Sequence, residues 1–537
     1  MAKIFTEEEL NSCSKEILIT LFLSMQEQMQ DLNRNMERLI EQLAVSNNQR
    51  YGRSSEKMNV IDGQLELELI FNEAEALTEN KYVVEPVEED VIYVTRRKSK
   101  GKRDQDLKEL PVVEVCHTIP EDELMEIFGT NGWKQLPDEI YKRVIVEPAK
   151  YIVEEHHVAV YAGTDNQTII KADHPKSLLR NSIATPSLVA SIMNAKYVNG
   201  MPLHRIGQEF LRNDIHISKQ VMANWMIQCA ERYLGIMYDR LHRELYRFHV
   251  LQADETPVCV SKDGRPANSK SFMWIYRTGK NYQSTPIILY DYQKTRKSDH
   301  PEEFLRGFKG VCVCDGYSAY RKLDRENPDI IFSGCLAHAR RRFSDALKAL
   351  PKSRQDSAKD TVAYQALQQI AAIYHLDNQL ADLSAEDRLR KRELTVKPLT
   401  EAFFAWVKKI QENGTVPAKS KTMEGINYCI NHEESLKVFL TDGEVPLDNN
   451  ATEASLRSFC LHKHTWRLID TIEGAKASAI IYSITETAKV NNLNPFRYLE
   501  YLLGKLVEHQ DDTNDSFLNN LLPWSEKLPE ICRSQKK

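Results

Sequence analysis

Apolar residues recur every seven positions near the N-terminus, in two series offset from each other by four and three positions. The two series are Leu18, Met25, Leu32 and Leu39, and Phe22, Met29, Met36 and Leu43. Such spacing is typical of the a and d positions of a coiled coil. We therefore predict a coiled coil within residues 1–57, through which copies of the chain associate. A single amphipathic helix packed on its own chain is the alternative.

The apolar pattern weakens after this segment. Residues 58–104 pass from an acidic to a basic stretch, which is typical of a linker. Residues 105–180 predict a small β-rich module, with candidate strands at residues 144–146 and 151–161.

Helical spacing begins near Ser187 and continues through three segments. The apolar faces of the first two comprise Leu188, Ile192, Ala195, Leu203, Ile206 and Phe210. Pro202 is expected at the first position of the second helix, and Ser218 at the N-cap of the third. Residues 181–245 thus predict a helix-turn-helix whose last helix enters the DNA major groove. A helical hairpin without a DNA role remains open.

Short apolar runs of strand character follow. We expect strands at residues 250–253, 272–276, 285–290, 311–314 and 330–333, with a helix at residues 302–308. Three antiparallel strands, a helix and further strands make a ribonuclease-H-like core, which we assign to residues 246–344.

Helical spacing dominates the rest of the chain. Residues 345–440 predict a helical insertion, residues 441–480 a core helix that carries a glutamate, and residues 481–537 a C-terminal helical segment and tail. The fold class expected is a multidomain α+β protein.

Acidic residues stand at the ends of two strand-like runs and in the first turn of the late helix. They are Asp254, Asp315 and Glu453. Mg²⁺ prefers oxygen ligands, and two such ions about 4 Å apart stabilise both the attacking and the leaving oxygen of phosphoryl transfer. Each acid also has a simpler interpretation. Asp254 ends a strand, Asp315-Gly316 makes a turn, and Glu453 closes a capping box with Asn450.

The charge distribution favours local rather than general binding of nucleic acid. The net charge is −6, but basic residues cluster at residues 96–103, 340–342, 388–392 and 462–467. Such clusters can bind phosphates in an acidic chain, although many are only solvated surface. We expect residues 388–392 of the insertion to contact phosphate.

The ten cysteines are scattered and form no Cys-x₂-Cys pair. A disulfide framework and a structural zinc site are therefore not expected. Cys335 and His338 make half of a zinc pattern at most, and His338 either contacts the scissile phosphate or serves only the structure. The sequence has no apolar run near the roughly 20 residues that span a bilayer and no signal-peptide pattern. We expect a cytoplasmic protein.

Several blocks, in order, resemble the DDE transposases of the insertion sequence 66 family. They are RYGRSSEK (50–57), SLVASIMNAKYVNGMPLHRIGQEF (187–210), ADETPV (253–258), CLAHARRRF (335–343), PLDNNATEASLR (446–457) and YSITETAKVNNLNPFRYLEYLL (482–503). Together they cover nearly the whole chain.

The resemblance implies roles for particular residues. Asp254, Asp315 and Glu453 match the catalytic, metal-binding acids, which would hold two Mg²⁺ or Mn²⁺ ions. Auxiliary positions are His338, Asn449, Asn450 and Arg457, and DNA-binding positions are Ser218, Lys219, Gln220, Arg340, Arg341, Lys463 and Trp466. The family's zinc-finger-like module is degenerate here, and its Gly-Arg-Lys-Asn-Trp run is replaced by LHKHTW (461–466).

The expected function is that of a transposase. It would bind the terminal inverted repeats of an insertion sequence and catalyse metal-dependent strand cleavage and transfer. Its expected partners are double-stranded DNA, further copies of the chain and accessory proteins of the same element. The alternatives are a DNA-binding regulator or remnant with a decayed catalytic centre, and a structure-specific nuclease.

Overall fold

The computed structural model describes Met125 and residues 150–162, 169–266, 269–282, 284–316, 320, 322, 327–350, 358–466 and 468–534. These residues divide between a large compact unit, Ser177–Ser534, and a smaller one that ends at Lys176. The predicted coiled coil, the linker and most of the predicted β-rich module lie outside the described residues. None of the described helices is both long enough and apolar enough to cross a membrane.

The smaller unit contains a short hairpin, in which β1 (Val160–Ala162) pairs antiparallel with β2 (Ile169–Lys171). The strand predicted at residues 151–161 is wrong over most of its length, because only its last two residues lie in β1. Ile152 and Val153 are 74% and 91% exposed. Their β-branched side chains favour a strand, but strand preference depends on burial and packing that these two side chains lack.

Three helices open the large unit where helical spacing predicted them. They are α7 (Pro186–Tyr197), α8 (Leu203–Arg212) and α9 (Lys219–Cys229). The Ser218 hydroxyl accepts the Val221 N–H and caps α9 as expected. Pro202 is the N-cap residue of α8 rather than its first helical residue. A π-helical turn (Ala230–Leu234) leads from α9 into α10 (Gly235–Leu245).

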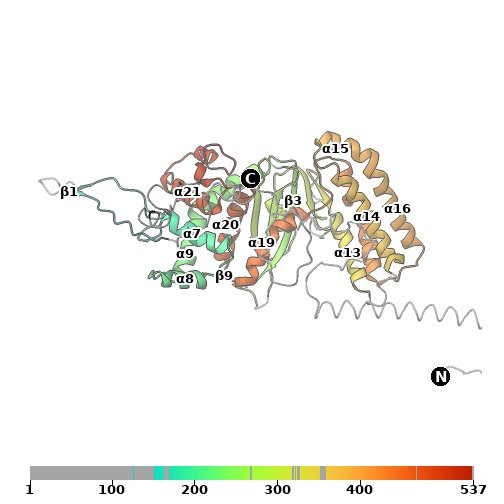
Figure 1. The fold of residues 1–537 in the computed structure, drawn as a ribbon, viewed down its shortest axis with the longest axis horizontal. Helices are drawn as coiled ribbons and strands as arrows, with labels where there is room; N and C mark the ends of the chain where they lie inside the picture. The colour runs from blue at the N-terminus through green and yellow to red at the C-terminus, as the bar shows by residue number, and fades with distance from the viewer. Residues whose placement is uncertain are drawn as a thin grey trace, which may run out of the picture. The chain divides into compact units, whose positions relative to one another are not determined.

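A five-stranded mixed sheet forms the centre of the large unit (Figure 1). Its order is β6 (Ile288–Gln293), β5 (Ser271–Thr278), β3 (Val250–Val258), β7 (Gly310–Cys314) and β8 (Ile330–Gly334). Of these five strands, the first three in sequence order, β3, β5 and β6, pair antiparallel. β7 and β8 run parallel to β3. Helix α11 (Asp299–Phe304) precedes β7. The predicted succession of elements is confirmed.

Two strand boundaries differ from the prediction. β3 does not end at Ala253 but continues to Val258, because β5 pairs with it from Leu251 to Val258 whereas β7 pairs only as far as Gln252. β6 begins at Ile288, later than predicted, since Pro286 has no N–H to give to a ladder.

Helix α20 (Ile472–Val490) packs along the edge strand β6 and satisfies part of its backbone. The Ile288 N–H donates to Thr487 Oγ1 at 3.0 Å, and the Tyr290 N–H donates to Ser483 Oγ at 2.7 Å. Both hydroxyls are fully buried. Helix α21 (Pro495–Glu508) follows and packs on α7. The C-terminal helices therefore join the sheet to the opening helices.

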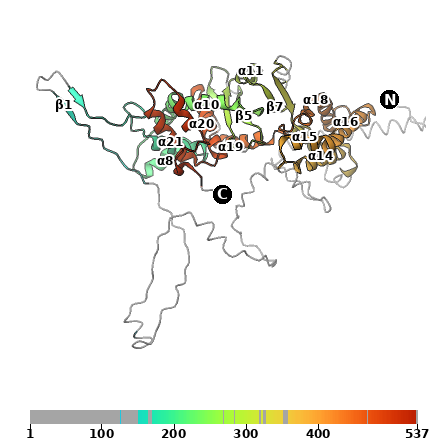
Figure 2. The same cartoon turned by 90° about the horizontal axis from the view of Figure 1, so that it is seen from above.

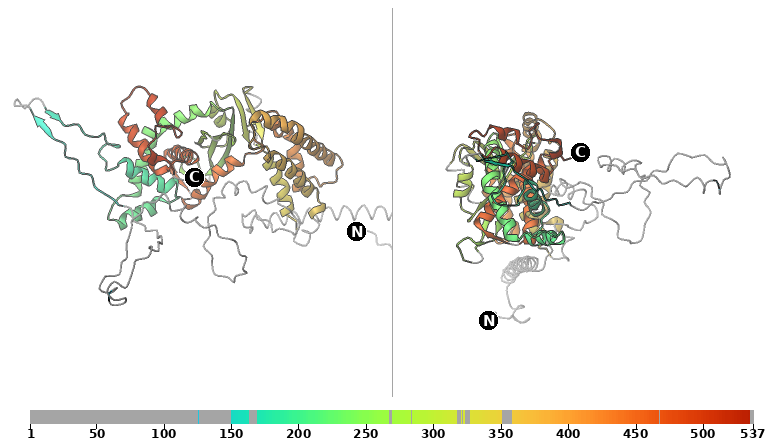
Figure 3. Two further views of the ribbon diagram at one scale, coloured as in Figure 1. Left: turned by 45° about the horizontal axis from the view of Figure 1, so that its top comes forward. Right: turned by 90° about the vertical axis from the view of Figure 1, so that its left-hand side faces the viewer.

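The apolar core of the predicted helical insertion continues onto the sheet at Val250, Val311 and Val313. The insertion itself is present beyond β8 (Figures 2 and 3). Its helices are α13 (Leu336–Lys348), α14 (Val362–Asn378), α15 (Ala385–Lys391), α16 (Lys397–Glu412), α17 (Lys421–Asn431) and α18 (Glu433–Leu436). Phosphate contact by the whole run 388–392 is wrong, because Arg388 and Arg392 are only 6% and 1% exposed. Arg390 and Lys391 are exposed.

After the insertion the chain returns to the sheet as α19 (Asn450–Trp466). This helix packs across β3 and β5. Beyond it, β9 (Ile469–Thr471) pairs in parallel with β4 (Val260–Lys262), a short continuation of β3. The glutamate helix is thus fixed to the central strand at both of its ends.

Asp291 on β6 makes the stability of the large unit depend on pH. Burial raises the pKa of this carboxyl from its ordinary value near 4 to about 6. Below pH ~4 the group is protonated in both the folded and the unfolded chain. As the pH rises through 6 the folded chain must carry a buried charge, and the stabilising contribution of the protonated carboxyl is lost.

We predict that Asp291→Asn raises the free energy of unfolding at pH 8 by on the order of 1–2 kcal/mol and leaves it unchanged near pH 4. Denaturant titrations at both pH values measure the difference. Asp382→Asn, which changes an exposed carboxylate, is the control and should have no effect. An equal effect of Asp291→Asn at both pH values would contradict the assignment.

Candidate active site

Asp254 and Asp315 lie together because their strands are parallel neighbours. Gln252 on β3 is opposite Val313 on β7. Asp254 is two residues beyond that pair, and Asp315 directly follows the last residue of β7. Asp315 is likewise two residues beyond Val313, so the parallel register brings both acids to the same level and the same face of the sheet, just past the end of the β3–β7 pairing.

Gly316 is closely packed against the insertion. A Cβ at this position would lie 2.8 Å from atoms of both Tyr428 and His432. A larger residue would require these two side chains to shift.

Asn449 fixes the N-terminus of α19 beside Asp254. Its side-chain N–H donates to the Ala253 carbonyl at 2.8 Å. Its Oδ1 accepts hydrogen bonds from Gln252 Nε2 at 3.1 Å and from Thr452 Oγ1 at 2.7 Å. Asn449 is fully buried. The first turn of α19, with Glu453, is consequently held against β3.

Glu453 faces Arg341 and His338 of α13 and does not close a capping box. Its Oε2 accepts a hydrogen bond from Arg341 Nη2 at 2.7 Å, and its Oε1 lies 3.8 Å from His338 Nε2. The N–H of Asn450 donates instead to Asp448 Oδ1 at 3.1 Å. The capping interpretation of Glu453 is therefore wrong, and its carboxylate is directed toward the proposed site.

The acids of the site repel one another. Burial raises the pKa of Asp254 well above its usual range, and the charges of Glu255, Asp315 and Glu453 raise it further. Burial likewise raises the pKa of Glu255, to about 7, against the opposing charge of Arg296. Arg296 pairs with Glu255 and lies 3.7 Å from Asp315 Oδ2. Carboxylates with this mutual effect are a feature of catalytic and metal sites.

Cys335 and His338 contact different residues. Cys335 is fully buried, and its Sγ accepts the Asn449 N–H at 3.1 Å. Burial raises the pKa of this thiol above its usual range, which disfavours the thiolate that zinc requires. His338 faces Glu453, and burial lowers its pKa, so its imidazole is neutral near pH 7.

The acids offer oxygen donors of the kind that a divalent cation prefers. Glu453 Oε1 and Glu255 Oε2 are buried without a hydrogen-bond partner among the described residues. Among the described residues, no three His, Cys, Asp or Glu side chains lie close enough together to hold a metal ion in the present arrangement. The donor chemistry fits a hard cation, while Arg341 neutralises Glu453 in this arrangement.

The remaining predicted positions differ in accessibility. Arg457 is exposed, one turn along α19 from Glu453. The arginine that pairs with Glu453 is Arg341. Lys463 donates to the Pro257 carbonyl at 2.8 Å. The Trp466 ring packs against Phe459 and beneath the ammonium of Lys196. Partly buried side chains are Arg340, Lys463 and Trp466, whereas Ser218, Lys219 and Gln220 are exposed on α9.

Two residues that take part in the site, Gln252 and Arg296, were not predicted from the sequence. Gln252 is fully buried and bridges β3 to Asp448 and Asn449. A polar residue inside an apolar strand run is a signal that points to such a bridge. Arg296 lies in an irregular basic segment, and nothing in its local sequence separates it from a solvated cation.

Family models cover most of the chain. Residues 181–477 match the model described as "Transposase IS66 family", and residues 483–524 match the "IS66 C-terminal element". Residues 38–115 match the model described as "Transposase C of IS166 homeodomain".

Curated relatives come from Sinorhizobium fredii (strain NBRC 101917 / NGR234). The uncharacterized protein y4qI is 27% identical over 401 residues, which cover 73% of this chain and 71% of the relative. The uncharacterized protein y4hP is 25% identical over 409 residues, which cover 74% of this chain and 72% of the relative. Since the first family model spans more than half of the chain and includes all three acids, the protein belongs to the IS66 family of transposases.

Proposed function

We propose that this transposase is of the DDE type, with Asp254, Asp315 and Glu453 as the residues that hold two Mg²⁺ or Mn²⁺ ions. The observation that carries the proposal is that three acids from separate parts of the chain meet. Asp315 and Glu453 lie close enough to Asp254 for their charges to raise its pKa. The sheet order β6-β5-β3-β7-β8 supports a ribonuclease-H-like core.

The reaction needs no protein nucleophile. In cleavage, the oxygen of water bonds to phosphorus as the P–O3′ bond breaks, and the 3′-oxygen leaves as a hydroxyl. In strand transfer, that hydroxyl attacks a phosphate of the target and releases the target's own 3′-oxygen. Bound divalent cations stabilise the attacking and leaving oxygens of such a displacement.

The chain's own residues orient the site. Asn449 keeps Glu453 beside Asp254 through its bonds to Ala253 and Thr452. Arg341 is 43% exposed while paired with Glu453, so it can exchange that carboxylate for a DNA phosphate. His338 is neutral near pH 7 and faces Glu453, where an imidazole can accept a hydrogen bond from the attacking hydroxyl.

Helices α7, α8 and α9 are proposed to bind the terminal inverted repeats as a helix-turn-helix. The buried face of α9 includes Met222 and Trp225, while Lys219, Gln220 and Asn224 are exposed. An exposed polar face at the beginning of the third helix suits base and phosphate contact. Self-association through residues 1–57, the absence of structural zinc, accessory partners and a cytoplasmic location remain predictions.

We predict that Asp254→Asn, Asp315→Asn and Glu453→Gln each reduce both cleavage and strand transfer by orders of magnitude and leave DNA binding intact. Each substitution keeps the size of the side chain and removes one charged oxygen ligand. Because residues of one site are not additive, the triple variant should be hardly less active than any single one.

Duplexes from the ends of the element, with Mg²⁺ or Mn²⁺, provide the assay. Glu302→Gln, an exposed acid on α11, is the matched control and should cleave normally. Normal cleavage by Glu453→Gln would remove Glu453 from the site. Normal cleavage by all three variants would contradict the assignment of the acids, whereas an inactive wild type that still binds the repeats would favour a regulator or remnant.

A second prediction concerns recognition. Lys219→Ala should weaken binding to all duplexes and lower the salt dependence of binding, by roughly one unit of slope in log K against log salt. Gln220→Ala should reduce the preference for repeat DNA over random DNA by about 1–3 kcal/mol. Arg232→Ala, which removes an exposed cation outside α9, should change the preference least. Unaltered binding by the first two variants would place recognition elsewhere.

A further inference from the structure

Two arginines of the insertion are buried where a basic run predicted DNA contact. Arg388 lies on α15, and Arg392 begins the π-helical turn (Arg392–Val396) that follows it. Arg392 is 1% exposed and Arg388 is 6% exposed. A buried guanidinium is costly unless its N–H groups are satisfied, so their partners indicate what these residues do.

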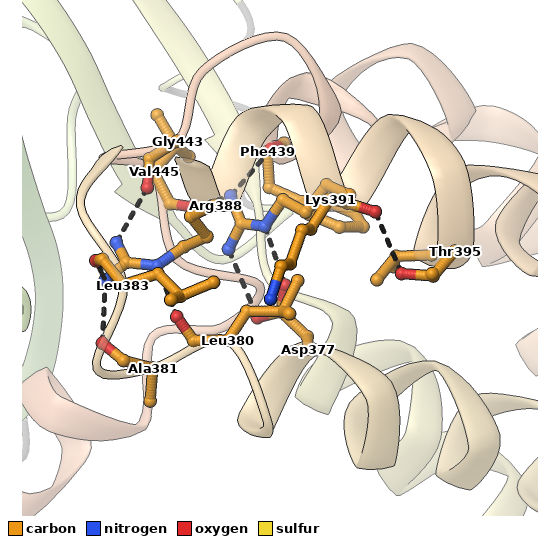
Figure 4. A network of polar contacts seen from close by, with 12 residues as sticks. Asp377, Leu380, Ala381, Leu383, Arg388, Lys391, Thr395, Phe439, Gly443 and Val445 are labelled. Atoms are coloured by element: carbon orange, nitrogen blue, oxygen red, sulfur yellow. Dashed lines mark hydrogen bonds and ion pairs between the residues drawn. The ribbon is translucent and has the colours of Figure 1, made fainter. Parts of the chain in front are cut away.

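Arg392 is directed to the segment 439–445, which leads from the insertion to α19. Figure 4 labels Phe439, Gly443 and Val445 of this segment. Its Nη1 donates to the carbonyls of Phe439, Asp442 and Val445 at 2.8, 3.1 and 2.8 Å. Its Nε and Nη2 donate to the two oxygens of Asp377 at 2.6 and 3.1 Å. The guanidinium thus neutralises an acid of α14 and holds three carbonyls of the segment at once.

Arg388 adds a fourth carbonyl to this set. It donates to Gly443 at 2.8 Å and to Leu380, Ala381 and Leu383 of its own neighbourhood at 3.2, 2.8 and 2.9 Å. Gly443 also requires its small size, since a Cβ there would lie 1.8 Å from the Ala385 carbonyl oxygen at the start of α15. The segment is therefore pressed against the insertion as well as bonded to it.

The sheet holds the same segment from the other side. Asp442 Oδ2 lies 2.7 Å from His249 Nε2, and Asn281 donates to the Glu444 carbonyl at 2.9 Å. The Tyr282 hydroxyl donates to the Glu444 carboxylate. The insertion binds four backbone carbonyls of the segment. Residues next to β3 and β5 bind the Glu444 carbonyl and the side chains of Asp442 and Glu444.

The segment continues directly into the site. Leu447 accepts the Leu336 N–H at 3.0 Å, and the Asp448 carbonyl accepts Gln252 Nε2 at 3.2 Å. Asn449 then bonds to Cys335 and Ala253 and begins the turn that carries Glu453. A short, buried and hydrogen-bonded stretch of chain therefore connects residues 439–445 to Glu453.

We infer that Arg388 and Arg392 are positioning residues for Glu453. The insertion thereby holds the active site in its arrangement, in addition to any DNA contact it makes. The inference rests on the proposed role of Glu453 as a metal-binding acid. Lysine cannot replace either arginine, because an ammonium lacks the planar fork that reaches several carbonyls together. A buried carbonyl left without a donor is destabilised, and the segment would rearrange.

The test compares Arg388→Lys and Arg392→Lys with Arg390→Lys in the full chain. Arg390 lies on the same helix, is exposed and pairs with Asp387, so its replacement controls for the loss of a guanidinium. Thermal unfolding and repeat-DNA binding report on folding. Cleavage as a function of Mn²⁺, Mn²⁺ binding followed by the spin-resonance signal of the free ion, and amide hydrogen exchange of residues 439–453 report on the site.

We expect Arg388→Lys and Arg392→Lys to remain folded and to bind DNA. Cleavage should fall by about tenfold to a hundredfold, because a displacement of about 1 Å can have that effect. The Mn²⁺ concentration for half-maximal cleavage and half-maximal binding should rise several-fold, and excess Mn²⁺ should restore part of the rate. Exchange should accelerate at residues 439–453, and Arg390→Lys should match the wild type in every measurement.

Folded Arg388→Lys with wild-type cleavage, Mn²⁺ dependence and exchange would overturn the inference. If Arg392→Lys fails to fold because Asp377 loses its partner, Arg388→Lys alone decides, since its hydrogen-bond acceptors are all carbonyls. Lower cleavage with unchanged Mn²⁺ dependence and unchanged exchange would also contradict it. Glu453→Gln in the same assay separates the two proposals, because normal cleavage by that variant overturns the proposed function, whatever the arginine variants do.

Discussion

The attachment of α19 to β3 through Asn449 is the interaction on which the rest of the site depends. Asn449 and Ala253 are 196 positions apart in the sequence, with the remainder of the sheet and the whole insertion between them. One buried amide side chain bonds to the backbone beside Asp254 and to the first turn that carries Glu453. It thereby joins the backbone beside Asp254 to the turn that carries Glu453.

Bringing acids together also has an electrostatic cost. The raised pKa of Asp254 and of Glu255 expresses the unfavourable free energy of burying several carboxylates side by side. Arg296 and Arg341 offset part of it by pairing with Glu255 and Glu453. Such strain is common where a binding site must accept a cation, because the ligand supplies the compensating charge. The insertion and the sheet hold the acids in place. The two arginines balance only part of the negative charge of these acids.

Periodicity was sufficient to predict the local elements of the large unit. The succession of strands, the capped helix after Ser218 and the helical insertion all follow from the spacing of apolar residues and from local capping chemistry. The convergence of Asp254, Asp315 and Glu453 does not follow from spacing, and it was expected only because several sequence blocks resemble a known family.

The errors have tertiary causes. Arg388 and Arg392 look like surface cations in the sequence, but irregular backbone with buried carbonyls needs donors, and the fold brings that backbone to them. In each case the partner lies far along the chain, beyond the reach of a local pattern.

The most direct test of the central claim is where a metal binds. Crystals of the full chain with terminal-repeat DNA and Mn²⁺, measured at the manganese absorption edge, locate the ion by its anomalous scattering. Manganese is expected on oxygens of Asp254, Asp315 and Glu453, with Arg341 moved from Glu453 to a DNA phosphate. Manganese bound elsewhere, with Glu453 still paired to Arg341, would contradict it.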